Sequence, residues 1–148
     1  MIHAQNDKVV AELPSAAVGA TATASLTVDT IGYDYCSLSV LRASNAATTF
    51  ANVLKVEESD SVSTNYSDVT ALVAGGTGGF TVPAISAAGT AGTSVVKLDV
   101  DTKARKRYLK VSYTPGASAT VAITGRLSRA AETPANASDA GVLTWVRG

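Results

Sequence analysis

The sequence contains few of the residues that enzymes and metal proteins use. Its 148 residues include one cysteine, one histidine and one tryptophan, and aromatic residues make up 5% of the chain. A single cysteine excludes an intramolecular disulfide, and His3 with Cys36 does not make the ligand set of a zinc site. A Ser-His-Asp or Cys-His catalytic arrangement needs a positioned histidine, whereas His3 lies in the N-terminal residues. We therefore expect no enzyme activity, no cofactor and no Cys/His metal site.

Charge is also scarce. Charged residues make up 16% of the chain, below the roughly 25% usual in soluble domains, and the formal net charge is zero. A neutral chain lacks the field that attracts nucleic acid or an anionic membrane. No apolar run reaches the roughly 18 to 20 residues of a membrane span, and the N-terminus lacks the pattern of a signal peptide. We expect neither nucleic acid nor membrane as a partner, whereas abundant small residues suit a surface covered by neighbouring subunits.

What the sequence does contain is alternation of apolar and polar residues with a period of two. The clearest example is 108–128, where two alternating runs flank Pro115-Gly116, and this pattern predicts a β-hairpin over a core. A further run at 94–100 is predicted to pair with 107–113. Seven or eight such runs, each bounded by turn residues, predict an all-β, single-domain β-sandwich or jelly roll. The other clear runs lie at 20–28, 33–40 and 50–58.

Three local patterns add detail to this prediction. In the run that Tyr33 opens, Cys36 shares a face with Leu38 and Val40, so we expect it to be a small core side chain. The segment 68–73 suits a single helical turn with Asp68 as its N-cap, after a polar loop over 59–67. The segment 80–85 suits a short strand interrupted by Pro83.

The two ends of the chain differ in composition from the middle. We divide the chain into an N-terminal arm or edge strand (1–17), a β-sandwich domain (18–129) and a C-terminal arm (130–148). Each arm contains a short apolar run, and the target of the C-terminal run is either its own sheet or a neighbouring subunit. These runs suit contact with a partner, and the densest basic run suits a polar contact. The expected partner-binding residues are Val9, Val10, Leu13, Arg105, Lys106, Arg107, Val142, Leu143, Trp145 and Val146.

Two further clusters have ordinary explanations. Glu57-Glu58 with Asp60, and Asp99 with Asp101, place carboxylates near loops where calcium binds in some proteins, but neither has the spacing of an EF-hand and both suit solvated strand ends. The glycine-rich run 75–79 lacks the Gly-Lys-Ser/Thr of a phosphate-binding loop, so a flexible loop is expected there.

Several segments resemble one protein family. The segments look like the pattern of small virion proteins of tailed bacteriophages, the head decoration or cement proteins. They are Asp29–Tyr35, Leu54–Asp60 leading into Tyr66–Val69, Arg107–Val111 and Leu127–Arg129. The resemblance covers roughly residues 20 to 130. It implies a jelly-roll-like domain, often a homotrimer, made in the host cytoplasm and bound to the outer surface of an icosahedral capsid. The implied partner is the major capsid protein, and no active-site residue is carried over.

Two alternative functions are also compatible with the sequence. A carbohydrate- or receptor-binding β module of a phage fibre or adhesin would use exposed aromatic rings, and the tyrosines are the available set. A tail or neck component of the same virion has no feature of composition that separates it from a head protein. The tyrosines in question are Tyr33, Tyr35, Tyr66, Tyr108 and Tyr113.

Overall fold

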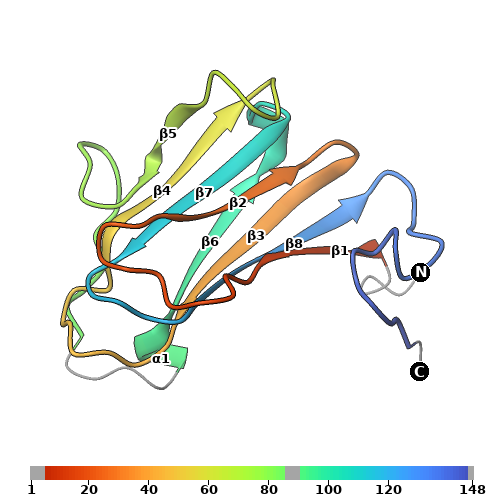
Figure 1. Cartoon of the computed structure of the whole chain (residues 1–148). Coiled ribbons are helices and arrows are strands. Elements are labelled where there is room, and N and C mark those ends of the chain that lie inside the picture. The colour runs from red at the N-terminus through yellow and green to blue at the C-terminus, as the bar shows by residue number, and fades with distance from the viewer. Residues whose placement is uncertain (1–5, 86–90, 147–148) are drawn as a thin grey trace.

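The protein is a sandwich of two four-stranded antiparallel sheets, as seen in a computed structural model that describes residues 6–85 and 91–146 (Figure 1). One sheet has the strand order β1-β8-β3-β6 and the other β2-β7-β4-β5. The all-β sandwich predicted from the alternating pattern is therefore confirmed. The strands are β1 (Lys8–Glu12), β2 (Ala24–Asp29), β3 (Tyr33–Arg42), β4 (Ala51–Ser59), β5 (Ser67–Val73), β6 (Val95–Asp101), β7 (Tyr108–Pro115) and β8 (Val121–Ala130), with a short helical turn α1 (Ala91–Ser94) before β6 and a 3-10 turn η2 (Thr102–Ala104) after it.

The strand order is that of a jelly roll. The pairs β1–β8, β2–β7, β3–β6 and β4–β5 are nested like the two halves of one long hairpin that has been wrapped over itself. This arrangement of eight strands in two sheets is the double Greek key found in viral capsid domains, lectins and cupins. Residues 1–17, which the sequence left open as an arm or an edge strand, contain β1 at the edge of its sheet.

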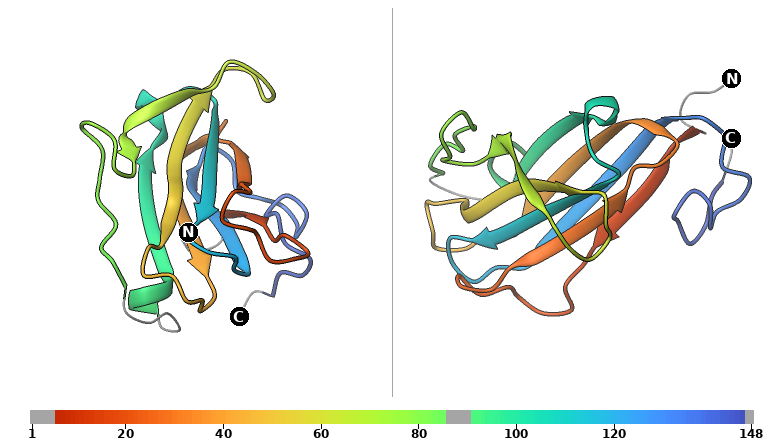
Figure 2. Two further views of the ribbon diagram at one scale, coloured as in Figure 1. Left: turned by 60° about the vertical axis from the view of Figure 1, so that its left-hand side comes forward. Right: turned by 90° about the horizontal axis from the view of Figure 1, so that it is seen from above.

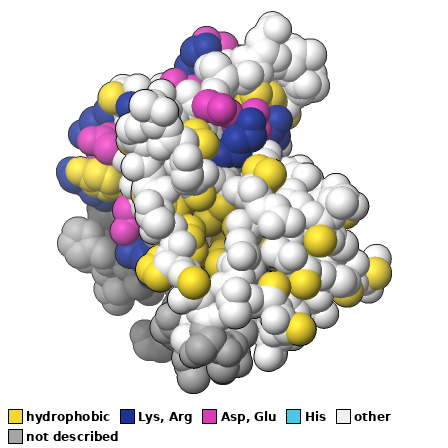
Figure 3. All heavy atoms as spheres, turned by 90° about the vertical axis from the view of Figure 1, so that its left-hand side faces the viewer, with side chains coloured by type: hydrophobic (Ala, Val, Ile, Leu, Met, Phe, Trp, Pro, Cys, Tyr) yellow, Lys and Arg dark blue, Asp and Glu magenta, His cyan; other side chains and the backbone are white. Residues whose placement is uncertain are grey.

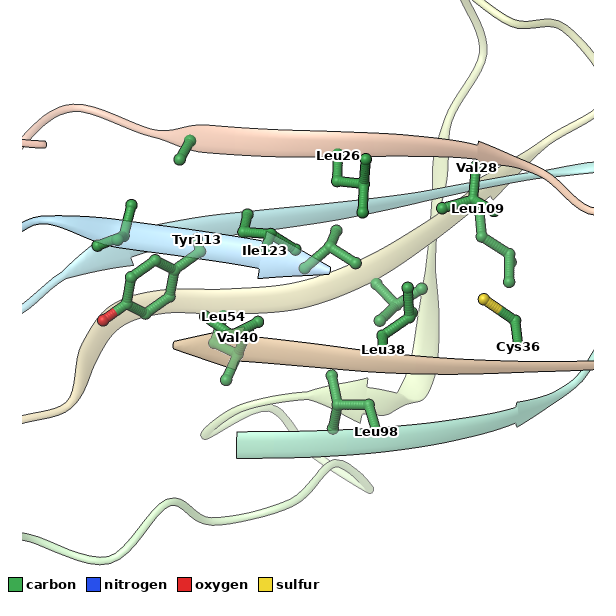
Figure 4. Packing of buried hydrophobic residues seen from close by; sticks show 14 of the residues in the cluster. Leu26, Val28, Cys36, Leu38, Val40, Leu54, Leu98, Leu109, Tyr113 and Ile123 are labelled. Carbon is green, nitrogen blue, oxygen red and sulfur yellow. The ribbon is translucent and has the colours of Figure 1, made fainter. Parts of the chain in front are cut away.

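Every second side chain of the strands points between the sheets and forms the core. Leu38, Val40 and Ile123 from one sheet and Leu109 and Val111 from the other belong to this core and have no exposed surface. Figure 4 shows Leu38, Val40, Leu109 and Ile123 between the strands. Burial of each such side chain stabilises the fold by roughly 1.5–3 kcal/mol. Cys36 lies in this core with 1% of its surface exposed, as predicted, and burial raises the pKa of its thiol to about 12.

The core is less completely covered on the side where β5 and β6 form the sheet edges. Leu72, Phe80, Val82, Ile85 and Val96 pack against the core but keep part of their surface exposed. Figure 3 shows hydrophobic side chains in a hollow on the left-hand side of Figure 1, the side on which β5 lies. The small side chains that dominate the sequence thus give a thin core with a partly open margin.

The hairpin predicted at Pro115-Gly116 is wrong. β7 pairs with β2 and β4, and β8 pairs with β1 and β3, so the Pro-Gly turn carries the chain from one sheet to the other. Alternation requires a buried face but does not say which sheet supplies it. Gly116 is needed because a Cβ there would lie 2.3 Å from the carbonyl oxygen of Thr49.

The predicted pairing of 94–100 with 107–113 is wrong for the same reason. β6 pairs with β3, and η2 leads across to β7 in the other sheet. Asp101 begins η2 as its N-cap, because its carboxylate accepts a hydrogen bond from the backbone N–H of Lys103 at 3.0 Å.

The segment 68–73 is not a helical turn, and 80–85 is not a strand. Residues Ser67–Val73 form β5 along the edge of β4, so pairing with β4 outweighs the local capping tendency of Asp68. Phe80 makes a single bridge with Ala74. Between them the glycine run folds into a tight turn, in which Gly75 and Gly78 adopt positive φ angles of 72° and 77°.

Candidate functional site

Most of the predicted contact residues lie at one end of the sandwich, which we call the terminal end. There β1, β3 and β7 begin, β2, β6 and β8 end, and the first and last of the described residues lie (Figure 1). The opposite end, which we call the loop end, includes the connections 13–23, 43–50 and 116–120 and the described residues 74–85 and 91–94. The right-hand view of Figure 2 shows the same separation from above.

The C-terminal segment is fastened to β1 before it reaches its apolar tip. The backbone N–H of Val9 donates to the carbonyl oxygen of Ala140 at 2.8 Å, and the hydroxyl of Thr133 donates to the side chain of Asn6 at 2.6 Å. Gly141 fits against this strand because a Cβ there would lie 2.0 Å from the carbonyl oxygen of Val9. The attachment positions residues 142–146 at the surface beyond β1.

The apolar residues predicted for partner contact differ in exposure. Leu143 is 100% exposed and Val146 is 83% exposed, whereas Val142 and Trp145 are half-buried. Such exposure of large apolar side chains costs free energy unless another surface covers them.

On β1, Val9 is exposed at the surface while Val10 packs against the core. Leu13 is 70% exposed but follows the loop-end side of β1, so the structure separates it from the other predicted residues.

The basic run 105–107 lies between η2 and β7, also at the terminal end. The Arg107 guanidinium donates two hydrogen bonds to the Asp29 carboxylate, at 2.9 and 2.7 Å, and holds the pKa of that carboxyl below its usual value. Arg105 lies 3.7 Å from Glu58, whose carboxylate also accepts the backbone N–H of Lys106 at 3.2 Å. The run is therefore largely engaged with carboxylates of its own chain.

A shallow groove of about 680 Å³ lies on the outer face of β8, β3 and β6, next to the N-terminal residues. Tyr35, 39% exposed, lies in it with the guanidinium of Arg129 5.6 Å from its ring centre. Across the groove, Asp99 accepts from Lys97 at 2.8 Å and from the Ser37 hydroxyl at 2.7 Å, and both contacts lower its pKa, Lys97 more than Ser37. On the remaining side, Arg126 forms an ion pair with Asp7.

The sequence alone does not indicate this groove. Its residues come from three strands far apart in the chain, and only the register brings Ser37, Asp99 and Arg126 side by side. The outward positions of each strand could be read from the alternation, but their neighbours could not.

The acidic clusters are occupied by contacts within the chain. Asp99 and Asp101 share the outer face of β6, yet Asp99 pairs with Lys97 and Asp101 caps η2. Burial raises the pKa of Glu57, but hydrogen bonds from Lys55, Ser112 and Lys110 outweigh it and hold the pKa below its usual value. Within residues 6–85 and 91–146, no three side chains of His, Cys, Asp or Glu gather as a metal site would require.

The tyrosines also divide by burial. Tyr113 is fully buried and donates its hydroxyl to the Phe50 carbonyl at 2.8 Å, and burial raises its pKa to about 12. Lys110 lies 4.2 Å from the Tyr66 ring centre, and Arg107 lies 4.9 Å from that of Tyr108. Tyr35 is the tyrosine that faces the groove.

Comparison with protein-family models, curated proteins and solved structures gives no match for this chain. Among the described residues, no helix has the length and apolar character needed to cross a bilayer.

Proposed function

We propose that this chain is a structural virion protein that decorates the outer surface of an icosahedral phage capsid and stabilises it by bridging major capsid subunits. The observation that carries the proposal is the exposed apolar tip, Leu143 and Val146, on a segment fastened to β1 through Ala140. A clamp works by rigid geometry and buried contacts and needs no reacting group. The jelly-roll order and the low share of charged residues support the same role.

In this proposal the protein is made in the host cytoplasm and self-associates, as a homotrimer, before or while it binds the shell. Several weak contacts made at once give a trimer a much higher effective affinity than one copy has. The apolar tip and the surface around Val9 form the contacts, and the basic run 105–107 borders them at the same end.

The experiment is a binding assay on purified heads that lack the protein. Removal of residues 142–148 takes away the tip and keeps Ala140 and Gly141, which pack on β1. We expect the occupancy of the heads to fall at least 10-fold. Because the backbone N–H of Val142 donates to the carbonyl oxygen of Ala137 at 2.9 Å and Trp145 is half-buried, the isolated protein should lose a little stability but still unfold cooperatively in urea. Unchanged occupancy would remove the tip from the contact, and no binding by the full chain would overturn the proposed function.

A second candidate function is carbohydrate binding by the groove that contains Tyr35. The observation that favours it is the combination of an exposed ring with hydrogen-bonding carboxylates and guanidinium groups, which suits a polyhydroxylated ligand. A glycan array with the full chain tests it, with Tyr35→Ala as the variant and Tyr66→Ala as the matched control. Binding that Tyr35→Ala abolishes and Tyr66→Ala preserves would favour a receptor-binding module.

A third candidate is a tail or neck component. It differs from the first only in position, so a reconstruction of the whole virion distinguishes the two.

A further inference from the structure

The sandwich has four sheet edges, and three of them are blocked against another strand. On β6 the outward side chains Lys97, Asp99 and Asp101 carry charge, which natural proteins use to prevent edge pairing. The β4–β5 ladder is interrupted by a register shift between Lys55 and Glu57, and β5 ends in the glycine turn. On β1 the carbonyl of Ala140 already accepts the N–H of Val9.

The edge of β2 carries none of these protections. Its inward residues Ala24, Leu26 and Val28 are buried, while its outward residues Ser25 and Thr27 are short, uncharged and exposed. Within the part of the chain that the structure describes, no hydrogen bond between backbone groups outside the β2–β7 ladder involves Ala24–Asp29. The backbone N–H of Ile31 donates to the side chain of Asp29, not to the backbone of the strand. Asp29, the one charged residue of the strand, is neutralised by Arg107.

The chain also carries a segment that fits such an edge. Residues 142–146 read Val-Leu-Thr-Trp-Val, a run of uncharged residues with high β propensity, and they form no strand in the structure. In an extended conformation, alternate residues point to opposite faces, so Leu143 lies on one face and Val146 on the other. An uncharged apolar strand matches the uncharged edge of β2, whereas the charged edge of β6 would exclude it.

The segment runs away from β2 in its own molecule. It leaves the sandwich at Ala140, on β1, and passes on the side of β1 that faces away from β2 (Figure 1). The segment 142–146 and the edge of β2 therefore lie at different places on one molecule. A contact between the segment of one copy and the β2 edge of the next is a head-to-tail contact, and such contacts close into a ring when they are repeated around a symmetry axis.

We infer that residues 142–146 of one copy add as a fifth strand to the free edge of β2 in the next copy. Backbone hydrogen bonds supply the affinity, as in other cases of strand addition, and Leu143 or its neighbours extend the apolar face formed by Leu26 and Val28. This inference rests on the proposed self-association and names the surface that performs it. Three such contacts complete a ring in which each copy gives one strand and receives one.

Engineered disulfides test the contact directly. In a Cys36→Ala background, the double variant Thr27→Cys/Thr144→Cys places one thiol on β2 and one on the segment, both at exposed positions. Mild oxidation is expected to give covalent ladders that end at three copies on a non-reducing gel. The matched control Lys97→Cys/Thr144→Cys, with the first thiol on β6, is expected to stay unlinked. Equal ladders from both variants, closure within single chains, or no linkage in the first variant would each overturn the inference.

A charge on the edge gives an independent measurement. Thr27→Lys is expected to raise the dissociation constant of the oligomer at least 10-fold by light scattering, whereas Thr70→Lys, on the exposed face of β5, leaves it unchanged. An equal urea midpoint for both variants shows that each still folds. No effect of Thr27→Lys on the oligomer would overturn the inference.

Binding to heads separates this inference from the proposed function. Linked rings that do not bind heads would leave the β2 contact standing and overturn the capsid role. Binding of the protein to heads without any disulfide linkage at β2 would leave the capsid role standing and overturn the β2 contact.

Discussion

The arginine side chains at the loop end and at the terminal end of the sandwich differ in burial and in their partners. At the loop end Arg42 is 2% exposed, and its guanidinium donates to the carbonyl oxygens of Thr49 at 2.8 Å and of Ala47 and Phe50 at 3.4 Å. At the terminal end the guanidinium groups of Arg107, Arg126 and Arg129 lie on the surface, in ion pairs. The first arrangement fastens a loop from inside, and the second leaves a surface that another molecule can cover.

Buried contacts around Arg42 hold the loop end together from inside the molecule. Around Arg42, the ring of Phe50 lies 5.2 Å from the guanidinium, and Tyr113 donates to the same carbonyl that Arg42 contacts. The loop 43–50 is thus held by a small buried network. Nothing comparable covers Leu143, whose side chain is entirely exposed.

The largest expected effect comes from breaking the loop-end network. Arg42→Ala removes the buried side chain and leaves carbonyl groups unsatisfied, so we expect the free energy of unfolding to fall by about 3 to 4 kcal/mol. Arg42→Met, which keeps most of the packing, should cost less. Urea denaturation of both variants measures the change, and a loss below about 1 kcal/mol for Arg42→Ala would contradict the network's role.

A smaller effect is expected from Glu57, a buried carboxylate in the second half of β4. Its pKa is below the usual value, so its contribution to stability is present above the unfolded-state pKa and is lost as the pH falls through the folded-state pKa. Glu57→Gln should therefore flatten the fall in stability between about pH 5 and pH 3. Urea midpoints across that range measure it, with Glu12→Gln on β1 as the control. If the urea midpoint of Glu57→Gln fell with pH as steeply as that of the native chain, Glu57 would not be the group that causes the loss of stability.

The smallest effect is expected at the terminal end. Arg126→Ala removes the ion pair with Asp7 beside the groove, and since the guanidinium is largely exposed we expect a change within about 1 kcal/mol. The same urea titration applies. A loss as large as that of Arg42→Ala would erase the contrast between the two ends.

The faces of the strands could be predicted from the sequence, but their partners could not. The alternation of Cys36, Leu38 and Val40 identifies the buried face of β3, and the same period places residue 42 on that face. The burial of Arg42 follows from this pattern. The crossing at Pro115-Gly116 was not readable, because a run of alternating residues satisfies either sheet equally well.

The same limit applies to the candidate site. The apolar tip at Leu143 and Val146 could be predicted because a polar spacer isolates it in the sequence. The groove could not, since Tyr35, Asp99 and Arg126 become neighbours through long-range strand pairing.

The nested order of the strands sets a rule for how the chain is made. β8 lies between β1 and β3, and among the strands of the described residues it is the last to be synthesised. The sheet that contains the N-terminus therefore stays open until synthesis has passed Ala130, and such long-range closure is slow. A nascent chain therefore carries an unfinished sheet until β8 has been made and has paired with both β1 and β3.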